Sequence, residues 1–373
     1  MPCESPFPKL RWDIFCRVID NFGDLGVCWR LACHLAGRGQ AVRLWADDPT
    51  ALAWMAPHGA PGVEVRNWTT PIGMTGITPG EVLVEAFGCE IDEAFVAEYA
   101  KTIRNKGQKC AWINLEYLSA EDFSARCHGL PSPVMSGPGR GLTKHFFYPG
   151  FTADTGGLLR EPELIARQAR FDRKAWLAEL GLSWQGERLL SLFCYEPAGL
   201  GGLLRSLASD ARLSRLLVTP GRAADAVRAE ISRMNALDPR WNQQQTLSLF
   251  YLPPLSQLDF DHLLWASDVN FVRGEDSLVR ALWAGKPFVW QIYPQHDGVH
   301  AHKLEAFLDW LQAPASLRAF HCRWNGLEAP DPALPDAPFE PELWRDCAAQ
   351  ARANLLEQED LGTQLLNFIG KIL

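Results

Sequence analysis

The residue types best suited to chemistry stand together in the run 273–277, Arg-Gly-Glu-Asp-Ser. The apolar stretch 268–272 before it is typical of a short strand, and the apolar side chains after it repeat at helical spacing. We expect the run to form a tight turn. A helix that starts directly off a buried strand presents unpaired backbone N–H groups and the positive end of its dipole, which together bind phosphate. Ser277 would add a hydroxyl donor and Arg273 a fixed charge.

Two carboxylates in the same run indicate a second kind of chemistry. Glu275 and Asp276 would repel a phosphate and instead suit sugar hydroxyl groups or a cationic partner. Together with Gly274 and the phosphate-binding groups, they indicate a ligand that carries both phosphate and sugar. The run also fits a helix that is simply capped by Asp276 or Ser277, and this structural interpretation stays open.

A second group of carboxylates follows the first expected strand, residues 12–19. The loop 20–26 reads Asp-Asn-Phe-Gly-Asp-Leu-Gly, and a helical pattern and a second strand at 41–45 come after it. In open α/β sheets, ligands bind at the carboxyl ends of the strands, where this loop lies. The loop lacks the Gly-x-Gly-x-x-Gly pattern, so the sequence predicts no dinucleotide there.

Five residues of this loop are candidates for contact with a substrate: Asp20, Asn21, Phe22, Gly23 and Asp24. A glycine lets the backbone approach a ligand closely. Two carboxylates are more than helix capping requires. Asp24 is the better placed of the two to cap the helix. If Asp24 caps the helix, Asp20 is left free to contact a ligand.

Composition excludes several classes of function. The chain has 373 residues and a formal net charge of −8, with no run of Lys or Arg, which argues against a nucleic-acid-binding protein. No apolar run approaches the roughly 18 residues of a membrane span, and the first residues lack the regions of a signal peptide. The ten cysteines form no Cys-x-x-Cys pair. We expect them to be reduced core residues of a cytoplasmic protein, with no metal site.

Strands and helices alternate twice along the chain, which predicts an α/β protein with mostly parallel sheets. A Pro- and Gly-rich segment at 129–157 and a charged helical stretch at 161–180 separate the two series. We expect an N-terminal Rossmann-like, acceptor-side domain at 1–155 and a C-terminal Rossmann-like, nucleotide-sugar-binding domain at 156–345. The helical segment 346–373 could pack back on the first domain. The remaining strands are expected at 82–87, 110–115, 145–148, 188–195, 215–219, 247–252 and 287–292.

Two specific motif blocks resemble those of a known family. The run 12–31 with Arg43-Leu-Trp, and the run 271–281 with Gln291-Ile-Tyr-Pro-Gln, resemble the signatures of EarP, the bacterial elongation factor P arginine rhamnosyltransferase family. The similarity extends over essentially the whole chain. It implies a GT-B glycosyltransferase fold with two facing Rossmann-like domains and an interdomain cleft. It also implies inverting chemistry, dTDP-β-L-rhamnose as donor and one arginine of translation elongation factor P as acceptor.

The family's catalytic aspartate corresponds to Asp20. Because the pKa of arginine lies above about 12, a carboxylate there would pair with the guanidinium and accept its proton late in the transition state. Asp24 and Asp13 are the second candidates, although a structural hydrogen bond explains Asp13 equally well. Glu275 and Asp276 would orient sugar hydroxyls or the incoming arginine. Arg273 would neutralise the leaving group, unless it forms a salt bridge with a nearby carboxylate.

The resemblance also assigns the donor. Ser277 and the helix N-terminus would bind the diphosphate, and no metal is expected because the helix dipole and Arg273 could stabilise the leaving diphosphate. The other donor contacts would come from strand ends: Phe250, Leu252 and Gln257 near the thymine, Tyr195 at a phosphate or the deoxyribose, and Tyr293 and Gln295 at the sugar. Two alternatives stay open, namely a GT-B enzyme for another nucleotide sugar and a small-molecule acceptor, and a non-catalytic module that binds a translation factor.

Overall fold

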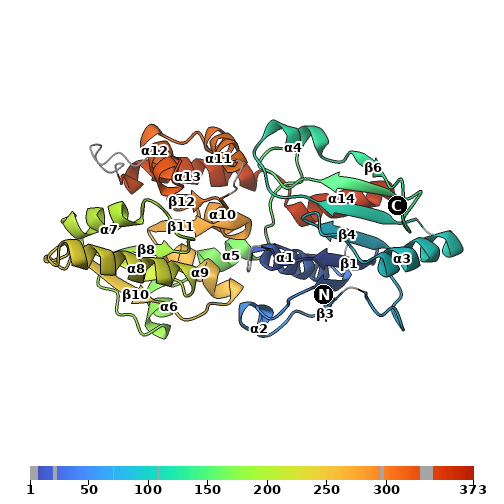
Figure 1. The fold of residues 1–373 in the computed structure, drawn as a ribbon, viewed down its shortest axis with the longest axis horizontal. Helices are drawn as coiled ribbons and strands as arrows, with labels where there is room; N and C mark the ends of the chain where they lie inside the picture. Colours follow the sequence, from blue (N-terminus) through green and yellow to red (C-terminus); the bar gives the residue numbers. More distant parts are fainter. Residues whose placement is uncertain (1–6, 20–22, 70, 108, 295–297, 328–338) are drawn as a thin grey trace. The chain divides into compact units, whose positions relative to one another are not determined.

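The computed structural model describes residues 7–19, 23–69, 71–107, 109–294, 298–327 and 339–373. The chain divides into two compact units. Unit 1 joins Met1–Glu161 with Glu357–Leu373, and unit 2 is Pro162–Leu356. In each unit helices cover a mostly parallel sheet (Figure 1).

Unit 1 is built on a seven-stranded sheet of order β3-β2-β1-β4-β5-β7-β6. All neighbouring strands are parallel except β6, which runs antiparallel to β7 at one edge. Its strands are β1 (Arg11–Cys16), β2 (Ala41–Ala46), β3 (Val63–Asn67), β4 (Val82–Ala86), β5 (Ala111–Leu115), β6 (Pro131–Pro133) and β7 (Thr143–Phe147). Its helices are α1 (Gly23–Gly37), α2 (Leu52–Met55), α3 (Glu93–Lys106), α4 (Asp122–Cys127) and α14 (Leu361–Ile372).

Both faces of this sheet are buried, which explains why its central strands are nearly continuous apolar runs. On one face, Ile14 of β1 belongs to a core cluster that includes residues of α1 and α14. On the other face, Phe15 stacks on Trp45 with ring centroids 5.3 Å apart, and Phe95 of α3 meets both rings edge-on. Alternate residues of one strand thus hold helices on opposite sides of the sheet.

The last helix of the chain, α14, belongs to unit 1. Asp360 caps it by accepting the N–H of Thr363 at 2.9 Å. The same carboxylate lies 3.0 Å from Nε2 of the buried His34 on α1 and 3.2 Å from Nη2 of Arg38, which directly follows α1. Burial opposes its ionisation, but the hydrogen bond and charge of His34, together with Thr363, hold the pKa of Asp360 well below its ordinary value.

Unit 2 is built on a five-stranded, fully parallel sheet of order β10-β9-β8-β11-β12. Its strands are β8 (Arg188–Leu192), β9 (Ser214–Val218), β10 (Leu247–Tyr251), β11 (Val269–Arg273) and β12 (Phe288–Gln291). Its helices are α5 (Leu164–Ala169), α6 (Arg173–Glu179), α7 (Leu200–Ser209), α8 (Arg222–Leu237), α9 (Gln257–Ala266), α10 (Gly274–Ala284), α11 (Val299–Trp310), α12 (Ala315–Trp324) and α13 (Pro341–Leu356).

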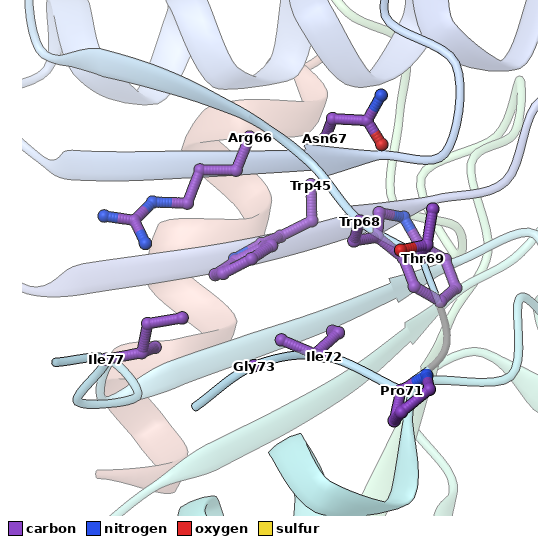
Figure 2. A pocket seen from close by; sticks show the side chains of 9 residues that line it. All are labelled: Trp45, Arg66, Asn67, Trp68, Thr69, Pro71, Ile72, Gly73 and Ile77. Carbon is purple, nitrogen blue, oxygen red and sulfur yellow. The ribbon is translucent and has the colours of Figure 1, made fainter. Parts of the chain in front are cut away.

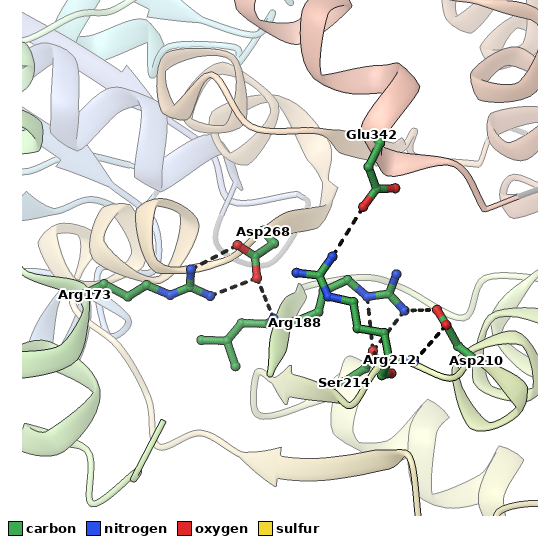
Figure 3. Close-up of polar contacts among 8 residues, drawn as sticks. Arg173, Arg188, Asp210, Arg212, Ser214, Asp268 and Glu342 are labelled. Atoms are coloured by element: carbon green, nitrogen blue, oxygen red, sulfur yellow. Dashed lines mark hydrogen bonds and ion pairs between the residues drawn. The ribbon is translucent and has the colours of Figure 1, made fainter. Parts of the chain in front are cut away.

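Structural ion pairs occupy the amino ends of the strands in unit 2 (Figure 3). Asp268, just before β11, accepts two hydrogen bonds from Arg173, at 3.0 and 2.9 Å, and a third from the backbone N–H of Leu189 at 2.8 Å. Arg188, the first residue of β8, pairs with Asp210 at 2.6 Å. These contacts fix the starts of β8 and β11, whose opposite, carboxyl ends carry the candidate donor residues.

Local structure differs from the sequence expectation in several places, of which three bear on the site or its support. The stretch 161–180 forms two short helices, α5 and α6, because Asp172 between them caps the second by accepting two backbone N–H groups. The edge strand β3 was not expected, and its mostly exposed residues explain the weak apolar signal. The third difference, at residues 273–277, belongs to the candidate site and is described with it.

Asp360→Asn tests the docking of α14. Asparagine caps a helix as well as aspartate does, so the substitution removes only the charge that faces His34 and Arg38. We expect a loss of stability of roughly 1–3 kcal/mol at pH 7, measured as a shift of the urea unfolding midpoint. Because the pKa of Asp360 is depressed in the folded state, the wild-type advantage should be full above about pH 4 and fade as the pH falls below it.

Asp172→Asn is the matched control, since Asp172 is an exposed helix cap without a described ion pair. It should change stability by less than about 0.5 kcal/mol. Equal effects of the two substitutions, or a difference that persists unchanged at low pH, would show that the Asp360 charge does not hold α14.

Candidate active site

The central feature of unit 2 is the junction between β11 and α10. The strand ends at Arg273 and the helix begins at Gly274, so the expected turn at 273–277 is wrong and the first helical turn takes its place. Gly274 has φ of 62°, a left-handed conformation that glycine adopts without steric cost. The helix axis can therefore leave the strand abruptly.

Ser277 fastens this junction. Its hydroxyl donates to the carbonyl oxygen of Arg273, and the N–H of Arg273 donates back to Ser277 Oγ at 3.0 Å. The N-cap residue of α10 is Arg273, which makes no side-chain capping bond, so the expectation of a cap at Asp276 or Ser277 is wrong. The hydroxyl of Ser277 thus satisfies the backbone of Arg273 and fixes where the helix begins.

Arg273 carries a buried guanidinium with a donor left over. The residue is 7% exposed, and its guanidinium carbon lies 4.6 Å from the ring centroid of Phe193 and 4.4 Å from that of Tyr195. Nη1 is buried and has no hydrogen-bond partner, and no carboxylate among the described residues forms an ion pair with Arg273. A buried charged donor without a partner is costly, which favours an anionic ligand over the salt-bridge alternative.

Tyr195 lies at the centre of this aromatic and cationic cluster, just beyond β8. It is almost fully buried, and its backbone N–H donates to Oε1 of Gln291, at the end of β12, at 2.8 Å. Tyr293 meets its ring edge-on at 5.6 Å and is itself 46% exposed. The loops after β8 and β12 are thereby tied together on either side of the β11 junction.

Sequence reasoning missed a second arginine at the same edge. Arg222 opens α8, and its guanidinium carbon lies 4.7 Å from the centroid of the Tyr195 ring. It forms a two-pronged pair with Glu196, with Nε to Oε1 at 2.8 Å, and hydrogen bonding from Arg222 lowers the pKa of Glu196. The only local signal was Gly221, which has φ of 79° immediately before the helix.

The residues expected near a nucleotide base surround the end of β10. Leu252 is buried in a core cluster, and Phe250 packs against the same cluster while remaining partly exposed. Gln257 is the first residue of α9 and is 8% exposed. Ser256 caps α9 by accepting the N–H of Asp259 at 3.1 Å.

The two acidic residues of the motif lie in the first turn of α10. Glu275 forms an ion pair with Lys303 of α11 at 3.0 Å, and both side chains are about one-fifth exposed. Asp276 is partly exposed beside it. Gln295 lies outside the described residues. Lys303 fixes the orientation of the Glu275 carboxylate, and no sequence pattern had connected the two residues.

In unit 1, Asp20, Asn21 and Phe22 lie outside the described residues, and Gly23 is the first residue of α1. Asp24, in the first turn of α1, is 6% exposed, and its Oδ2 accepts the N–H of Ile19 at 2.9 Å. Asp24 therefore anchors the chain that leads into the loop.

Asp13 has a structural role. It is 1% exposed and accepts hydrogen bonds from Arg43 Nη2, Trp45 Nε1 and the N–H of Gly80, at 2.7, 2.8 and 2.7 Å. These bonds tie β1 to β2 and to the chain that enters β4. Of the two interpretations that the sequence left open, the contacts favour the structural one.

A separate pocket of about 390 Å³ lies at the ends of β2 and β3 in unit 1. Figure 2 shows that Trp45, Arg66 and Trp68 contribute to its lining, and the guanidinium carbon of Arg66 lies 5.3 Å from the Trp45 ring centroid. None of the candidate site residues that the structure describes line it. The pocket is formed where a loop, rather than a helix, follows β3.

Metal and membrane sites were also sought in the described part of the chain. No group of three or more His, Cys, Asp or Glu side chains there could hold a metal ion, and the cysteines described are all free. No helix among the described residues is long and apolar enough to cross a membrane.

Comparison with known proteins decides the family. The family model for the elongation factor P (EF-P) rhamnosyltransferase EarP matches residues 12–370. The chain belongs to the EarP family. The protein-arginine rhamnosyltransferase of Pseudomonas aeruginosa is 43% identical to it over 90% of this chain and 94% of the relative. The protein-arginine rhamnosyltransferase of Pseudomonas putida is 42% identical over 96% of this chain and 98% of the relative.

Solved structures agree with this membership. The structure from a study of EarP-mediated arginine glycosylation of translation elongation factor EF-P matches with a TM-score of 0.62 and 30% identity, over 98% of this chain and 100% of that one. The Streptomyces glycosyltransferase SsfS6 matches with a TM-score of 0.50 and 10% identity, over 97% and 99% of the two chains, which shows the fold alone. The predictions of the EarP family, of a rhamnosyltransferase enzyme and of a GT-B fold are confirmed.

Ser277→Ala tests the junction of this EarP-family protein. Without the hydroxyl, the buried N–H of Arg273 loses its described partner and the start of α10 is no longer fixed. We expect a lower melting temperature and a loss of dTDP affinity of roughly 1–3 kcal/mol, measured by calorimetry.

Ser232→Ala is the matched control, because Ser232 also donates to a carbonyl four residues earlier but lies on an exposed helix. It should leave dTDP affinity unchanged. Wild-type dTDP affinity in Ser277→Ala would contradict a role of the junction in binding the donor.

Proposed function

We propose that this protein transfers L-rhamnose from dTDP-β-L-rhamnose to an arginine side chain of translation elongation factor P, with inversion at the sugar. The observation that carries the proposal is the buried guanidinium of Arg273, which has an unpartnered donor beside the start of α10, in a chain of the EarP family. The names of the relatives support the arginine acceptor.

The donor diphosphate would bind at the β11–α10 junction. The first backbone N–H groups of a helix have no partner within it, and the dipole adds positive potential there. Arg273 would donate Nη1 to a phosphate oxygen and stabilise the charge that develops on the leaving dTDP. Ser277 would act by holding the helix start in place, and Gly274 would leave room for the phosphate beside the backbone.

The rest of the donor would extend along the carboxyl ends of the strands. Gln257 would hydrogen-bond the thymine, next to Phe250 and Leu252. Tyr195 would support the deoxyribose or a phosphate, with Tyr293 near the rhamnose. Gln295 and Asp276 complete the proposed sugar contacts, and Glu275, oriented by Lys303, would hold a sugar hydroxyl or the incoming arginine.

Asp20 would activate the acceptor. Protonated guanidinium is a poor nucleophile because its charge is delocalised, and its pKa is above about 12. A carboxylate beside it localises the electrons and accepts the proton as the bond to the sugar forms. Asp24, which holds Ile19 just before the loop, is the second candidate. Asn21, Phe22 and Gly23 would line the same loop.

The proposed setting of the reaction is the cytoplasm, with EF-P as protein partner, no metal cofactor and no nucleic acid. Free cysteines among the described residues and a net charge of −8 support this setting. The direct test is the intact mass of EF-P after incubation with the protein and dTDP-rhamnose. A gain of one deoxyhexose on one arginine supports the function, and an unchanged mass overturns it.

Donor binding can be located by amide hydrogen exchange. Because the phosphate would cover the junction, dTDP and dTDP-rhamnose should slow exchange in peptides that span 273–278. UDP and GDP serve as comparison ligands and should protect these peptides less at equal concentration. Protection that appears only in peptides of unit 1 would contradict the placement of the donor.

Asp20→Asn should separate catalysis from donor binding. The change keeps the size of the side chain and removes its basicity. We expect normal dTDP-rhamnose affinity and a loss of transfer to EF-P by roughly 10²–10⁴-fold, typical of a lost general base. Asp122→Asn, on an exposed residue of α4, is the control and should transfer normally. A folded Asp20→Asn protein that transfers at the wild-type rate would exclude Asp20 as the base.

A further inference from the structure

The turn after β4 in unit 1 is strained. Phe87 has φ of 57° and Gly88 has φ of 66°, and Cys89 closes the turn by donating its N–H to the carbonyl of Ala86 at 3.1 Å. Glycine adopts this left-handed conformation freely, whereas a bulky aromatic residue does so at a cost. Such strain persists where the surrounding structure enforces it, and it clusters at functional sites.

Two contacts hold Phe87 in this conformation. Its N–H donates to the carbonyl of Leu115 at 2.7 Å, and its ring stacks on Tyr117 with centroids 4.7 Å apart and planes inclined by 22°. Phe87 is 8% exposed, whereas Tyr117 is 39% exposed. The strained turn therefore serves to back a solvent-accessible tyrosine ring with a second aromatic ring.

Glu116, which immediately precedes Tyr117 in the chain, carries a carboxylate that forms no described ion pair. Glu116 is partly buried and accepts a hydrogen bond from Asn114 Nδ2 at 2.7 Å, and no Lys, Arg or His among the described residues forms an ion pair with it. Asn114 Oδ1 is buried and has no partner in the described chain. Burial, opposed by the bond from Asn114 and aided by the charge of Glu85, raises the pKa of Glu116. The group therefore offers acceptor oxygens and contains no positively charged side chain.

The topology places this group next to the proposed catalytic loop. The strand order runs from β1 through β2 to β3 on one side and from β4 to β5 on the other, so the order reverses between β1 and β4. Ligands of open α/β sheets bind outside the carboxyl ends of the strands at such a point. The loop of Asp20 follows β1, the strained turn follows β4, and Glu116 and Tyr117 follow β5 directly.

We propose that Glu116 and the stacked Phe87–Tyr117 pair form the binding site for the guanidinium group of the acceptor arginine. This inference rests on the proposed function. A guanidinium is planar, stacks on aromatic rings and donates up to five N–H bonds, which suits an aromatic surface near carboxylate and amide oxygens. Bound there, it lies at the edge of the sheet from which Asp20 would take its proton. Lysine, a compact point charge, fits such a surface less well.

A double-mutant cycle with the acceptor protein tests this assignment. The modified arginine of EF-P is first located by peptide mapping of the wild-type reaction, and an Arg→Ala acceptor is made at that position. Calorimetry with dTDP present then measures binding of both acceptors. Glu116→Gln and Tyr117→Leu should each weaken binding of intact EF-P about tenfold and leave binding of the Arg→Ala acceptor unchanged.

Two controls separate this role from a structural one. Tyr117→Phe keeps the aromatic ring and its stacking surface. Its affinity for intact EF-P should therefore lie within about twofold of the wild-type affinity. Glu90→Gln removes an exposed carboxylate from the loop after β4 and should have no effect. If Tyr117→Leu does not fold, the isosteric Glu116→Gln decides. Equal losses with both acceptors, or no loss with either, would overturn the assignment.

A free probe decides the inference even if EF-P is not the acceptor. At millimolar concentration, the NMR signals of arginine amide should broaden more in the presence of wild-type protein than those of lysine amide. Glu116→Gln should remove that difference. An EF-P mass that stays unchanged in the transfer assay would reject the proposed function alone. Wild-type protein that shows no preference for arginine amide would reject the guanidinium site.

Discussion

The abrupt passage from β11 into α10 is the constraint on which the candidate donor site depends. Ser277 satisfies both backbone groups of Arg273 with one hydroxyl, and Gly274 takes the left-handed conformation that lets the helix leave the strand at once. As a result, the helix N-terminus and the guanidinium of Arg273 arise at the same edge of the sheet. A longer link would place the helix start elsewhere and separate the two sources of positive potential.

Each unit carries, at the carboxyl ends of its strands, a charged side chain that forms no ion pair among the described residues. In unit 2, the buried guanidinium of Arg273 lies against two aromatic rings and forms no ion pair with a carboxylate of the described residues. In unit 1, Glu116 precedes Tyr117 of a stacked aromatic pair and forms no described ion pair. A diphosphate would satisfy the first and a guanidinium the second. The reaction proposed for this EarP-family protein brings one ligand of each kind together.

Sequence patterns predicted most strands and helices because apolar runs in a parallel sheet are long and contiguous. They did not predict contacts between distant residues. The bonds from Arg43, Trp45 and Gly80 to Asp13 join residues 30 to 67 positions apart. The stacking of Phe87 on Tyr117 likewise depends on the pairing of β4 with β5. The sequence pattern favoured a phosphate ligand for the Ser277 hydroxyl. Nothing in the sequence around Ser277 reveals that this hydroxyl bonds the backbone of Arg273 instead.

The central claim is that Arg273 recognises the phosphate groups of the donor. The most direct measurement is calorimetric comparison of dTDP with thymidine, in wild-type protein and in Arg273→Gln. If the unpartnered guanidinium donor binds phosphate, the substitution should weaken dTDP binding by roughly 1.5–3 kcal/mol, as for a hydrogen bond to a charged group, and leave thymidine binding unchanged. Equal losses for dTDP and thymidine, or no loss for dTDP, would contradict this account.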